Sequence, residues 1–350
     1  MKICYNELKM EDTMIKLAID AMGGDNAPIE IVKGCDLALE RYNDIELVLY
    51  GDEAEIKKYL KATSRVEIVH TTQVVDMGVK DPVSAIRNMK DSSLVRALKG
   101  VKEGREQAVV SAGPTQALIV GAHLVIKRME KMHRVALAPI IPSLDQKGKI
   151  LLDVGANIEL RPEHMLELGI YATVVAKSYL GIDNPSLALM NIGTEEGKGR
   201  ELEKETFKLL KANPQINFIG NIEGKEIMTT SASIVLTDGY TGNVLMKTIE
   251  GTAKAMGGML KEEIKSSLGG IIGALFMKKA LNRFKKRMDA SEIGGAMIFG
   301  INAPVIKAHG SSDAYAFSNA IKQARLFVLN DIIGKVTEAL KDVEIEESRD

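Results

Sequence analysis

Lysine, histidine, serine and asparagine recur beside glycine in this sequence, and together these residue types can hold an oxyanion. The segment PVIKAHGSS brings together Lys307, His309, Gly310, Ser311 and Ser312. A lysine supplies positive charge, a histidine exchanges a proton near neutral pH, and serines and amides at a helix start can bind phosphate. We expect a strand that ends near Lys307 and a helix that begins near the two serines. The alternative is an ordinary helix cap with a structural lysine and histidine beside it.

A second segment, TDGYTGNVLMKTIEG, places an amide and an ammonium four residues apart. Asp238 is expected to close a strand, Gly242 to permit a close approach, and Asn243 to open a helix that carries Lys247. Residues four apart share a helical face, so the amide could orient a carbonyl while the ammonium neutralises an anion. A plain N-cap role for Asn243 is the competing interpretation.

Two shorter segments have the same character. In NIGTEEGKG, glycines flank Lys198, which suggests a mobile loop over a site or else a solvated loop without a role. In LLDVGAN, Asp153 and Asn157 bracket a glycine turn. None of these segments is specific when taken singly.

The segment LAIDAMGGDNAP has the form of a strand, a glycine turn and a helix start. Asp20 ends the apolar run, Gly23 and Gly24 make the turn, and Asp25 follows them. Strand–turn–helix junctions are where α/β proteins bind phosphates, on the amides of the helix. The two carboxylates would repel the same anion, so we expect them to play a different part.

The elements that must position these residues alternate along the chain. The chain contains apolar runs typical of strands, and several of them end in glycine or a small polar residue with a helical pattern following. They cover residues 15–19, 45–51, 65–70, 107–113, 149–157, 186–193, 216–222 and 233–239. This alternation predicts a mainly parallel sheet with helices on both faces, and a ligand site beyond the carboxyl ends of the strands.

Composition excludes several classes of function. The 350 residues include 46 Lys and Arg against 47 Asp and Glu, and tryptophan is absent, so neither charge nor stacking surface favours nucleic acid. Cys4 and Cys35 cannot build a disulfide framework, and Cys35 on an apolar helical pattern is interpreted as structural. We find no signal peptide or spanning segment, and expect a cytoplasmic protein.

One region breaks the alternation of strands and helices. Residues 261–288 read KEEIKSSLGGIIGALFMKKALNRFKKRM, with Met277, Leu281, Phe284 and Met288 on one helical stripe and basic residues on the others. Such a helix could lie on an anionic membrane, or it could pack against a second subunit. The pattern alone favours the second. The side chains expected at a membrane are Ile271, Ile272, Leu275, Phe276, Met277 and Phe284.

Six segments, in this order, resemble the acyl-carrier-protein:phosphate acyltransferase family of bacterial phospholipid synthesis, the PlsX family. They are IDAMGGDNAP, DPVSAIRNMKDSS, LLDVGAN, NIGTEEGKG, DGYTGNVLMKTIEG and APVIKAHGSS. The resemblance runs from about Ile15 to about Leu329. It implies a three-layer α/β/α sandwich, related to phosphate acetyltransferases and isopropylmalate dehydrogenase, with a projecting helical arm.

The same resemblance implies an activity and partners. A member transfers a long-chain fatty acyl group from acyl-carrier protein to inorganic phosphate, giving acyl phosphate for a downstream acylphosphate:glycerol-3-phosphate acyltransferase. Members work as homodimers and associate peripherally with the membrane, which favours the membrane interpretation of the arm. One departure is SAGPTQA, where Pro114 and Gln116 replace the usual asparagine and glycine. Pro114 removes a backbone donor, and Gln116 disfavours positive φ.

The expected domain organisation is a single one. Residues 1–14 are interpreted as a loose tail, 15–335 as one α/β acyltransferase domain with the arm at about 255–292, and 336–350 as an acidic tail.

Phosphate is already an anionic nucleophile, so the expected mechanism needs no covalent enzyme intermediate or strong base. No cofactor or metal is expected. Asp20 and Asp25 are expected to hold turn amides and lysines, or one of them to bind the pantetheine arm. The catalytic candidates are Lys198, Asn243, Lys247, Lys307 and His309. The substrate-binding candidates are Asp20, Gly23, Gly24, Asp25, Ser111, Gly113, Thr115, Asp153, Asn157, Asp238, Gly242, Gly310, Ser311 and Ser312.

Two other functions compete. A nucleotide-dependent dehydrogenase on a related fold would need a glycine fingerprint, and MGGDNA is not GxGxxG. A non-enzymatic scaffold on a membrane surface would use only the basic arm.

Overall fold

The computed structural model describes residues 14–143, 148–288, 294–341 and 343. The expected N-terminal tail therefore lies outside the described residues up to position 13, together with Cys4. In the described part, strands and helices alternate as the apolar pattern predicts, and helices cover both faces of the sheets.

The first sheet has seven strands in the order β3-β2-β1-β4-β12-β11-β5. Five neighbouring strands, β3 to β12 in this order, are parallel, and β11 runs antiparallel to both of its neighbours. The strands are β1 (Ile15–Asp20), β2 (Ile45–Gly51), β3 (Val66–His70), β4 (Ala108–Ser111), β5 (Ala136–Ala138), β11 (Ala296–Phe299) and β12 (Val305–Lys307).

The second sheet has five strands in the order β6-β7-β10-β8-β9, parallel except for β6. The strands are β6 (Ile140–Ile141), β7 (Lys149–Leu152), β8 (Ser186–Asn191), β9 (Asn217–Glu223) and β10 (Ile234–Leu236). The chain crosses from one sheet to the other at Pro139, between β5 and β6. The sequence pattern predicts most of these strands but not β5, β6 and β11, and it does not show that the strands divide into two sheets.

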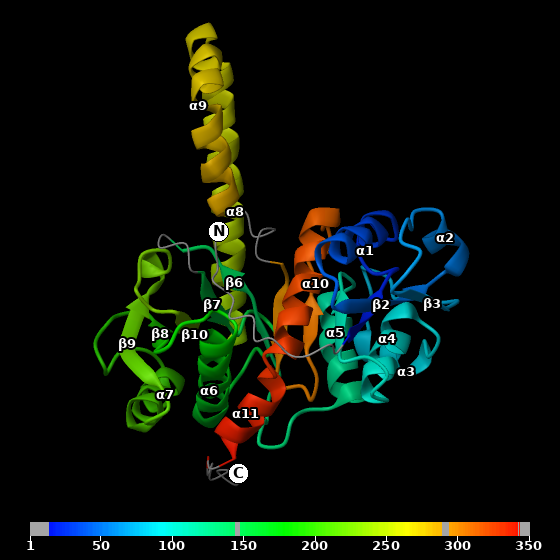
Figure 1. Cartoon of the computed structure of the whole chain (residues 1–350). Coiled ribbons are helices and arrows are strands. Elements are labelled where there is room, and N and C mark those ends of the chain that lie inside the picture. Colours follow the sequence, from blue (N-terminus) through cyan, green and yellow to red (C-terminus); the bar gives the residue numbers. More distant parts are fainter. Residues whose placement is uncertain (1–13, 144–147, 289–293, 342, 344–350) are drawn as a thin grey trace.

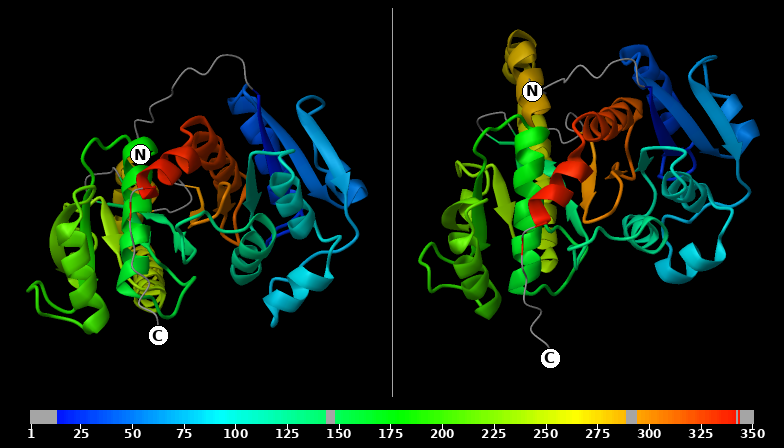
Figure 2. Two further views of the ribbon diagram at one scale, coloured as in Figure 1. Left: turned by 90° about the horizontal axis from the view of Figure 1, so that it is seen from below. Right: turned by 60° about the horizontal axis from the view of Figure 1, so that its bottom comes forward.

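Helices cover both faces of each sheet and give the three-layer architecture (Figure 2). Leu17 and Ile19 of β1 face one apolar core and Ala18 faces the other, because successive strand residues point to opposite sides. The helices of the body are α1 (Ile29–Arg41), α2 (Glu53–Lys57), α3 (Pro82–Asn88), α4 (Ser93–Lys102), α5 (Thr115–Gly121, continued as a π-helix to Ile126), α6 (Pro162–Ser178), α7 (Glu201–Ala212), a 3₁₀ turn (Gly224–Glu226), α10 (Ala314–Leu329) and α11 (Ile332–Leu340).

The end of α11 lies within the region that the sequence predicts to be an acidic tail. Val336 and Leu340 are fully buried against the core, so the chain stays packed to the end of this helix. Cys35 is likewise fully buried in α1, and burial raises the pKa of its thiol.

The arm is a pair of helices that projects from the body, α8 (Gly239–Lys265) and α9 (Leu268–Met288) (Figure 1). It starts earlier than the expected position 255, because α8 begins inside the body. Residues 289–292 of the expected arm, and the side chains of residues 285–288, lie outside the description. Within the described part, no helix is both long and apolar enough to cross a membrane.

The arm nevertheless exposes many apolar side chains. Phe276 is 87% exposed and Leu268 is 80% exposed. The other exposed apolar side chains of the two helices are Val244, Met256, Met259, Leu260, Ile271, Ile272, Leu275, Met277 and Phe284.

Candidate active site

Three predicted site residues end neighbouring strands of the first sheet. The strand register pairs Asp20 of β1 with Ser111 of β4, and Ser111 with Lys307 of β12. All three side chains are buried. The carboxyl ends of parallel strands meet at one edge, so this edge concentrates a carboxyl, a hydroxyl and an ammonium group.

Asp20 holds the first of the glycine turns. Its Oδ2 accepts a hydrogen bond from the Ser111 hydroxyl at 2.6 Å, and Ser111 Oγ accepts one from the Gly113 amide at 3.0 Å. Burial raises the pKa of Asp20, while hydrogen bonds from Ser111 and Ser93 oppose that change. A Cβ on Gly23 would lie 2.3 Å from Asp20 Oδ2, so only glycine fits at that point of the turn.

Lys307 is a buried cation at the same edge. Its Nζ donates to the Ala112 carbonyl at 3.3 Å and to the Ala308 carbonyl. Burial lowers the pKa of Lys307 to about 8, although Asp20 and Asp25 act in the opposite direction. The effect of burial on the ammonium thus outweighs that of the two carboxylates, so an anion bound beside Lys307 would stabilise its charged form.

The loops after β1 and β12 are packed together. The Asp25 amide donates to the Gly310 carbonyl at 2.8 Å, and Asn26 Nδ2 donates to the carbonyls of Ser311 and Ser312. Gly24 has a φ of +115°, a conformation that favours glycine. The Asp20 carboxylate thus holds the end of β4 through Ser111, whereas Asp25 joins the two loops through its backbone amide. Both carboxylates act to raise the pKa of Lys307.

His309 is oriented by its own loop. The Ser311 amide donates to His309 Nδ1 at 3.2 Å, and Ser311 Oγ lies 2.9 Å from the same nitrogen. An accepting Nδ1 places the hydrogen of the neutral ring on Nε2. His309 is therefore arranged to donate a hydrogen bond from Nε2.

The helix after this loop starts later than predicted. α10 begins at Ala314, and Asp313, not a serine, caps it by accepting from the Ala316 amide at 2.8 Å. Glu30 accepts from the Ala314 amide at 2.9 Å. Because two carboxylates already occupy this helix start, it is not the phosphate site that the serines suggested.

Asp153 organises the loop after β7. Its Oδ1 accepts from the amides of Leu137, Gly155 and Ala156, and its Oδ2 from the amide and side chain of Asn157. The carboxylate is fully buried, so it is a framework group whose oxygens are taken.

The start of α8 packs directly on that loop. Asp238 caps the helix by accepting from the Thr241 amide at 2.8 Å, so the prediction that Asn243 opens the helix is wrong. Arg200 also donates to Asp238. A Cβ on Gly242 would lie 1.9 Å from the Asp153 carbonyl oxygen, which explains the predicted close approach.

One turn further along, Asn243 and Lys247 face a pocket. Gly155 has a φ of +124°, which favours glycine, and a Cβ there would lie 3.4 Å from Asn243 Nδ2, so the loop runs directly beside the amide. Lys247 Nζ lies 3.2 Å from Glu250 Oε2. The three side chains are spaced by four and three residues and so share one helical face.

The pocket has a volume of about 290 Å³ and is formed by both sheets. Five predicted site residues line it: Thr115, Asn243, Lys247, Lys307 and His309. The other lining residues are Gln116, Leu137, Pro139, Ile140, Val154, Gly155, Met246, Glu250, Gly294, Gly295, Ala296 and Ala308. It thus combines cationic, amide and hydroxyl groups with an apolar wall.

The remaining candidates do not line this pocket. Asp20 and Asp153 form hydrogen bonds within the loops that carry the lining residues. Ser311 and Ser312 follow the lining residue His309 in its loop. Lys198 is exposed in the loop after β8, where its carbonyl accepts from Asn191 at 3.0 Å. It is therefore not brought into the pocket.

Sequence reasoning missed several lining residues. Glu250 could have been found, because it continues the helical face of Asn243 and Lys247. Gly294 and Gly295 offered only the weaker signal of a glycine pair. In the structure, a Cβ on Gly295 would lie 2.6 Å from the Lys307 carbonyl oxygen. The apolar wall from β5 and β6 carried no signal, since its place depends on how the sheets meet.

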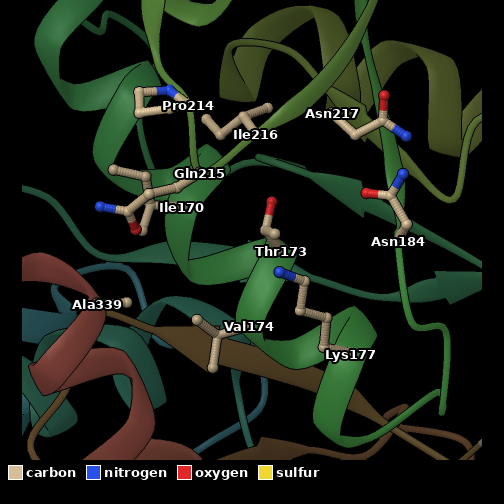
Figure 3. Close-up of a pocket in the computed structure, with 10 residues that line it drawn as sticks. All are labelled: Ile170, Thr173, Val174, Lys177, Asn184, Pro214, Gln215, Ile216, Asn217 and Ala339. Carbon is tan, nitrogen blue, oxygen red and sulfur yellow. The ribbon is translucent and has the colours of Figure 1, made fainter.

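A second pocket lies elsewhere, between α6, the segment before β9 and α11 (Figure 3). Its volume is about 340 Å³, and its one basic side chain is Lys177. No predicted site residue lines it. We therefore assign the chemistry to the pocket between the sheets.

No metal-binding cluster is evident in the described ranges, where three or more His, Cys, Asp or Glu side chains are nowhere grouped to hold an ion. The expectation of no metal and no cofactor stays a prediction.

Known proteins give this architecture a context. Residues 15–335 match the family model described as "Fatty acid synthesis protein". The phosphate acyltransferase of Acholeplasma laidlawii is 52% identical over 330 residues, covering 94% of this chain and 99% of that protein. The phosphate acyltransferase of Anoxybacillus flavithermus is 46% identical over 329 residues, covering 94% and 99%.

Solved structures share the fold. A phosphotransacetylase from Streptococcus pyogenes superposes with a TM-score of 0.61 at 16% identity, covering 92% of this chain and 94% of that one. A branched-chain phosphotransacylase from Enterococcus faecalis V583 gives 0.54 at 17% identity, covering 90% and 100%. The relatives do not favour the dehydrogenase alternative. The family match, together with these relatives, shows that the chain belongs to the PlsX family of phosphate acyltransferases.

Proposed function

We propose that this acyltransferase moves a long-chain fatty acyl group from acyl-carrier protein to inorganic phosphate. The observation that carries the proposal is the buried Lys307 beside Thr115, Asn243 and His309 in one pocket with an apolar wall. The pocket offers groups for an anion and for a carbonyl, together with a surface for a fatty thioester.

The reaction needs positioning more than covalent chemistry. Phosphate, held by Lys307 and the Thr115 hydroxyl, attacks the thioester carbonyl carbon with one of its oxygens. A tetrahedral oxyanion forms, and the Asn243 amide donates to it. The C–O bond to phosphate is kept, the C–S bond breaks with its electron pair on sulfur, and acyl phosphate leaves beside a thiolate.

His309 helps the leaving group in a way that its geometry specifies. Because Nδ1 accepts from Ser311, the neutral ring offers an Nε2–H hydrogen bond to the departing sulfur. A hydrogen bond, rather than full proton transfer, is the contribution proposed for His309, because a neutral imidazole is a weak acid. Lys247 and Glu250 lie at the mouth, where Lys247 attracts the anionic donor.

The proposal extends to the setting of the reaction. The product serves phospholipid synthesis, where a downstream acylphosphate:glycerol-3-phosphate acyltransferase consumes it. The chain acts as a homodimer, peripherally on an anionic membrane. The exposed apolar side chains of the arm, with Phe276 and Leu268 foremost, support such a contact.

The direct test is to incubate the protein with palmitoyl-carrier protein and labelled phosphate, and to trap acyl phosphate with hydroxylamine. We expect label and hydroxamate to form together, in amounts equal to the thiol released. Thiol release without acyl phosphate would mean that water, not phosphate, accepts the acyl group. If neither thiol nor acyl phosphate were formed, the acyl transfer itself would be refuted.

A further inference from the structure

Helix α8 carries a row of lysines that begins at the pocket and runs along the arm. Lys247 lines the pocket, and Lys254, Lys261 and Lys265 follow it after seven, seven and four residues. At 100° per residue these spacings keep all four side chains within about 40° of one line. Lys265 lies 18 residues after Lys247, about 27 Å further along the helix. We call Lys254, Lys261 and Lys265 the lysine stripe.

The charge of the lysine stripe is not neutralised by its surroundings. All three side chains are exposed, and no ion pair forms with them among the residues that the structure describes. By contrast, Lys247 has Glu250 as a partner. Glu262 and Glu263 of the same helix point about 60° and 160° away from Lys247. The unpaired charges of the lysine stripe therefore begin about one helical turn beyond Glu250 and run outward from the pocket along the same side of α8.

We propose that the lysine stripe docks the acidic protein that carries the acyl thioester, an inference that rests on the proposed function. The thioester must reach Asn243, and the stripe continues the same helical face outward from Asn243 and Lys247. A partner seated on the stripe is thus already aligned with the pocket. Complementary charge raises the encounter rate and sets the orientation of such a partner.

The position of the stripe distinguishes this partner from a lipid surface. α8 projects out of the body (Figure 1). Lys247, seven residues before the stripe begins, lines the pocket. A small globular partner fits between α8 and the body. A flat bilayer would instead contact the exposed apolar side chains of the arm, Leu268, Ile272 and Phe276.

The test compares two double charge reversals in the same arm. K254E with K261E alters the stripe, and K278E with K279E makes the same charge change on α9, where both lysines are exposed. Neither pair is placed in the catalytic machinery. Initial rates are measured without lipid at low salt, with palmitoyl-carrier protein and with palmitoyl-pantetheine, which lacks the protein.

We expect the stripe variant to raise the KM for the carrier-bound donor about 10-fold, because charges at an interface act mainly on encounter. Its kcat, its KM for phosphate and its rate with palmitoyl-pantetheine should stay within twofold of the wild type. The α9 variant should stay within twofold throughout. The wild-type KM should also rise with salt, and that of the stripe variant should rise less.

Other results overturn the inference. An unchanged KM, or equal increases in both variants, would remove the stripe as the docking surface. Reduced vesicle binding with an unchanged KM would assign the stripe to the membrane, and a changed oligomeric state would assign it to a second copy of the chain. A wild type that uses palmitoyl-pantetheine but not the carrier would refute the carrier as donor. One that uses neither would refute the proposed function.

Discussion

Lys307 is the residue whose environment does most to define the site. Its ammonium is buried at a strand end, bonded to two carbonyls, with Asp20 and Asp25 as the nearest carboxylates that influence it. Burial holds its pKa at about 8, below its ordinary value of 10.5. Because burial destabilises the charged form of Lys307, a bound phosphate dianion would stabilise that form.

This environment predicts a pH dependence. Lys307 loses its proton as pH rises through about 8, so the KM for phosphate should increase about 10-fold per pH unit above that value. Below it, the lysine is charged and this effect disappears. In Lys307→Arg the guanidinium stays charged, so the rise above pH 8 should vanish, whatever the change in absolute rate.

The KM for phosphate is measured at pH values from about 6.5 to about 9.5 in the wild type, in Lys307→Arg and in Lys177→Arg. Lys177 lines the other pocket and serves as the matched control. A Lys307→Arg profile that still turned near pH 8 would assign the titration to another group.

Asn243 is the proposed oxyanion donor. One such donor is worth about 3 kcal/mol, so Asn243→Ala should lower kcat by a factor on the order of 100 to 1,000. The KM for phosphate should change little. Asn184→Ala in the other pocket is the control and should keep full activity. Wild-type turnover in Asn243→Ala would exclude this residue from the chemistry.

The junction between α8 and the loop after β7 positions Asn243. Gly242→Ala would bring a Cβ to 1.9 Å from the Asp153 carbonyl oxygen. Because this oxygen belongs to the backbone, the clash can be relieved only if the helix or the loop moves. We expect a loss of about 2–3 kcal/mol in the free energy of unfolding, together with lower activity.

Gly251→Ala is the matched control on the same helix. Among the described residues outside its own helical turn, no atom lies within 4 Å of the point that an alanine Cβ would occupy. Alanine should therefore stabilise the helix by about 0.5–1 kcal/mol. Urea unfolding measures both changes. If the two variants were equally stable, the contact between helix and loop would not be as tight as the structure indicates.

The arm makes its own prediction as an element. Replacing Phe276, Met277 and Phe284 by polar residues removes apolar side chains that are more than half exposed. Flotation with anionic vesicles should be lost, while activity in solution should persist. Ile219→Asn changes an exposed apolar side chain of the body and should leave flotation intact. A triple variant that still floats would refute insertion of these side chains.

At the level of elements, the sequence was a good guide to strands and a weaker one to helix starts. The apolar runs 15–19, 45–51 and 65–70 predict β1, β2 and β3 to within one residue at either end. The helix starts after Ser312 and at Asn243 were misplaced because an aspartate, Asp313 or Asp238, takes the cap in each case. Aspartate is a favoured N-cap residue, so the sequence does contain the signal for both helix starts. The interpretation of Ser311, Ser312 and Asn243 as substrate-binding residues placed the starts elsewhere.

Across the whole molecule, the pocket depends on pairings between distant segments. Lys307 and Asn243 could be predicted as chemical candidates, but the division into two sheets could not, because strand order depends on long-range contacts. Leu137 and Pro139 enter the pocket only because the chain crosses between sheets there. The glycines around Lys198 indicate a loop but do not determine where it lies, so the exposed position of this lysine could not be predicted.

The central claim is that one pocket between the sheets holds phosphate on Lys307, within reach of Asn243. The most direct measurement is a crystal structure of the protein soaked in phosphate, with the anion located by difference density. We expect phosphate within hydrogen-bonding distance of Lys307 Nζ, on the side of the pocket lined by Thr115. An ordered phosphate bound elsewhere while this pocket stays empty would contradict it.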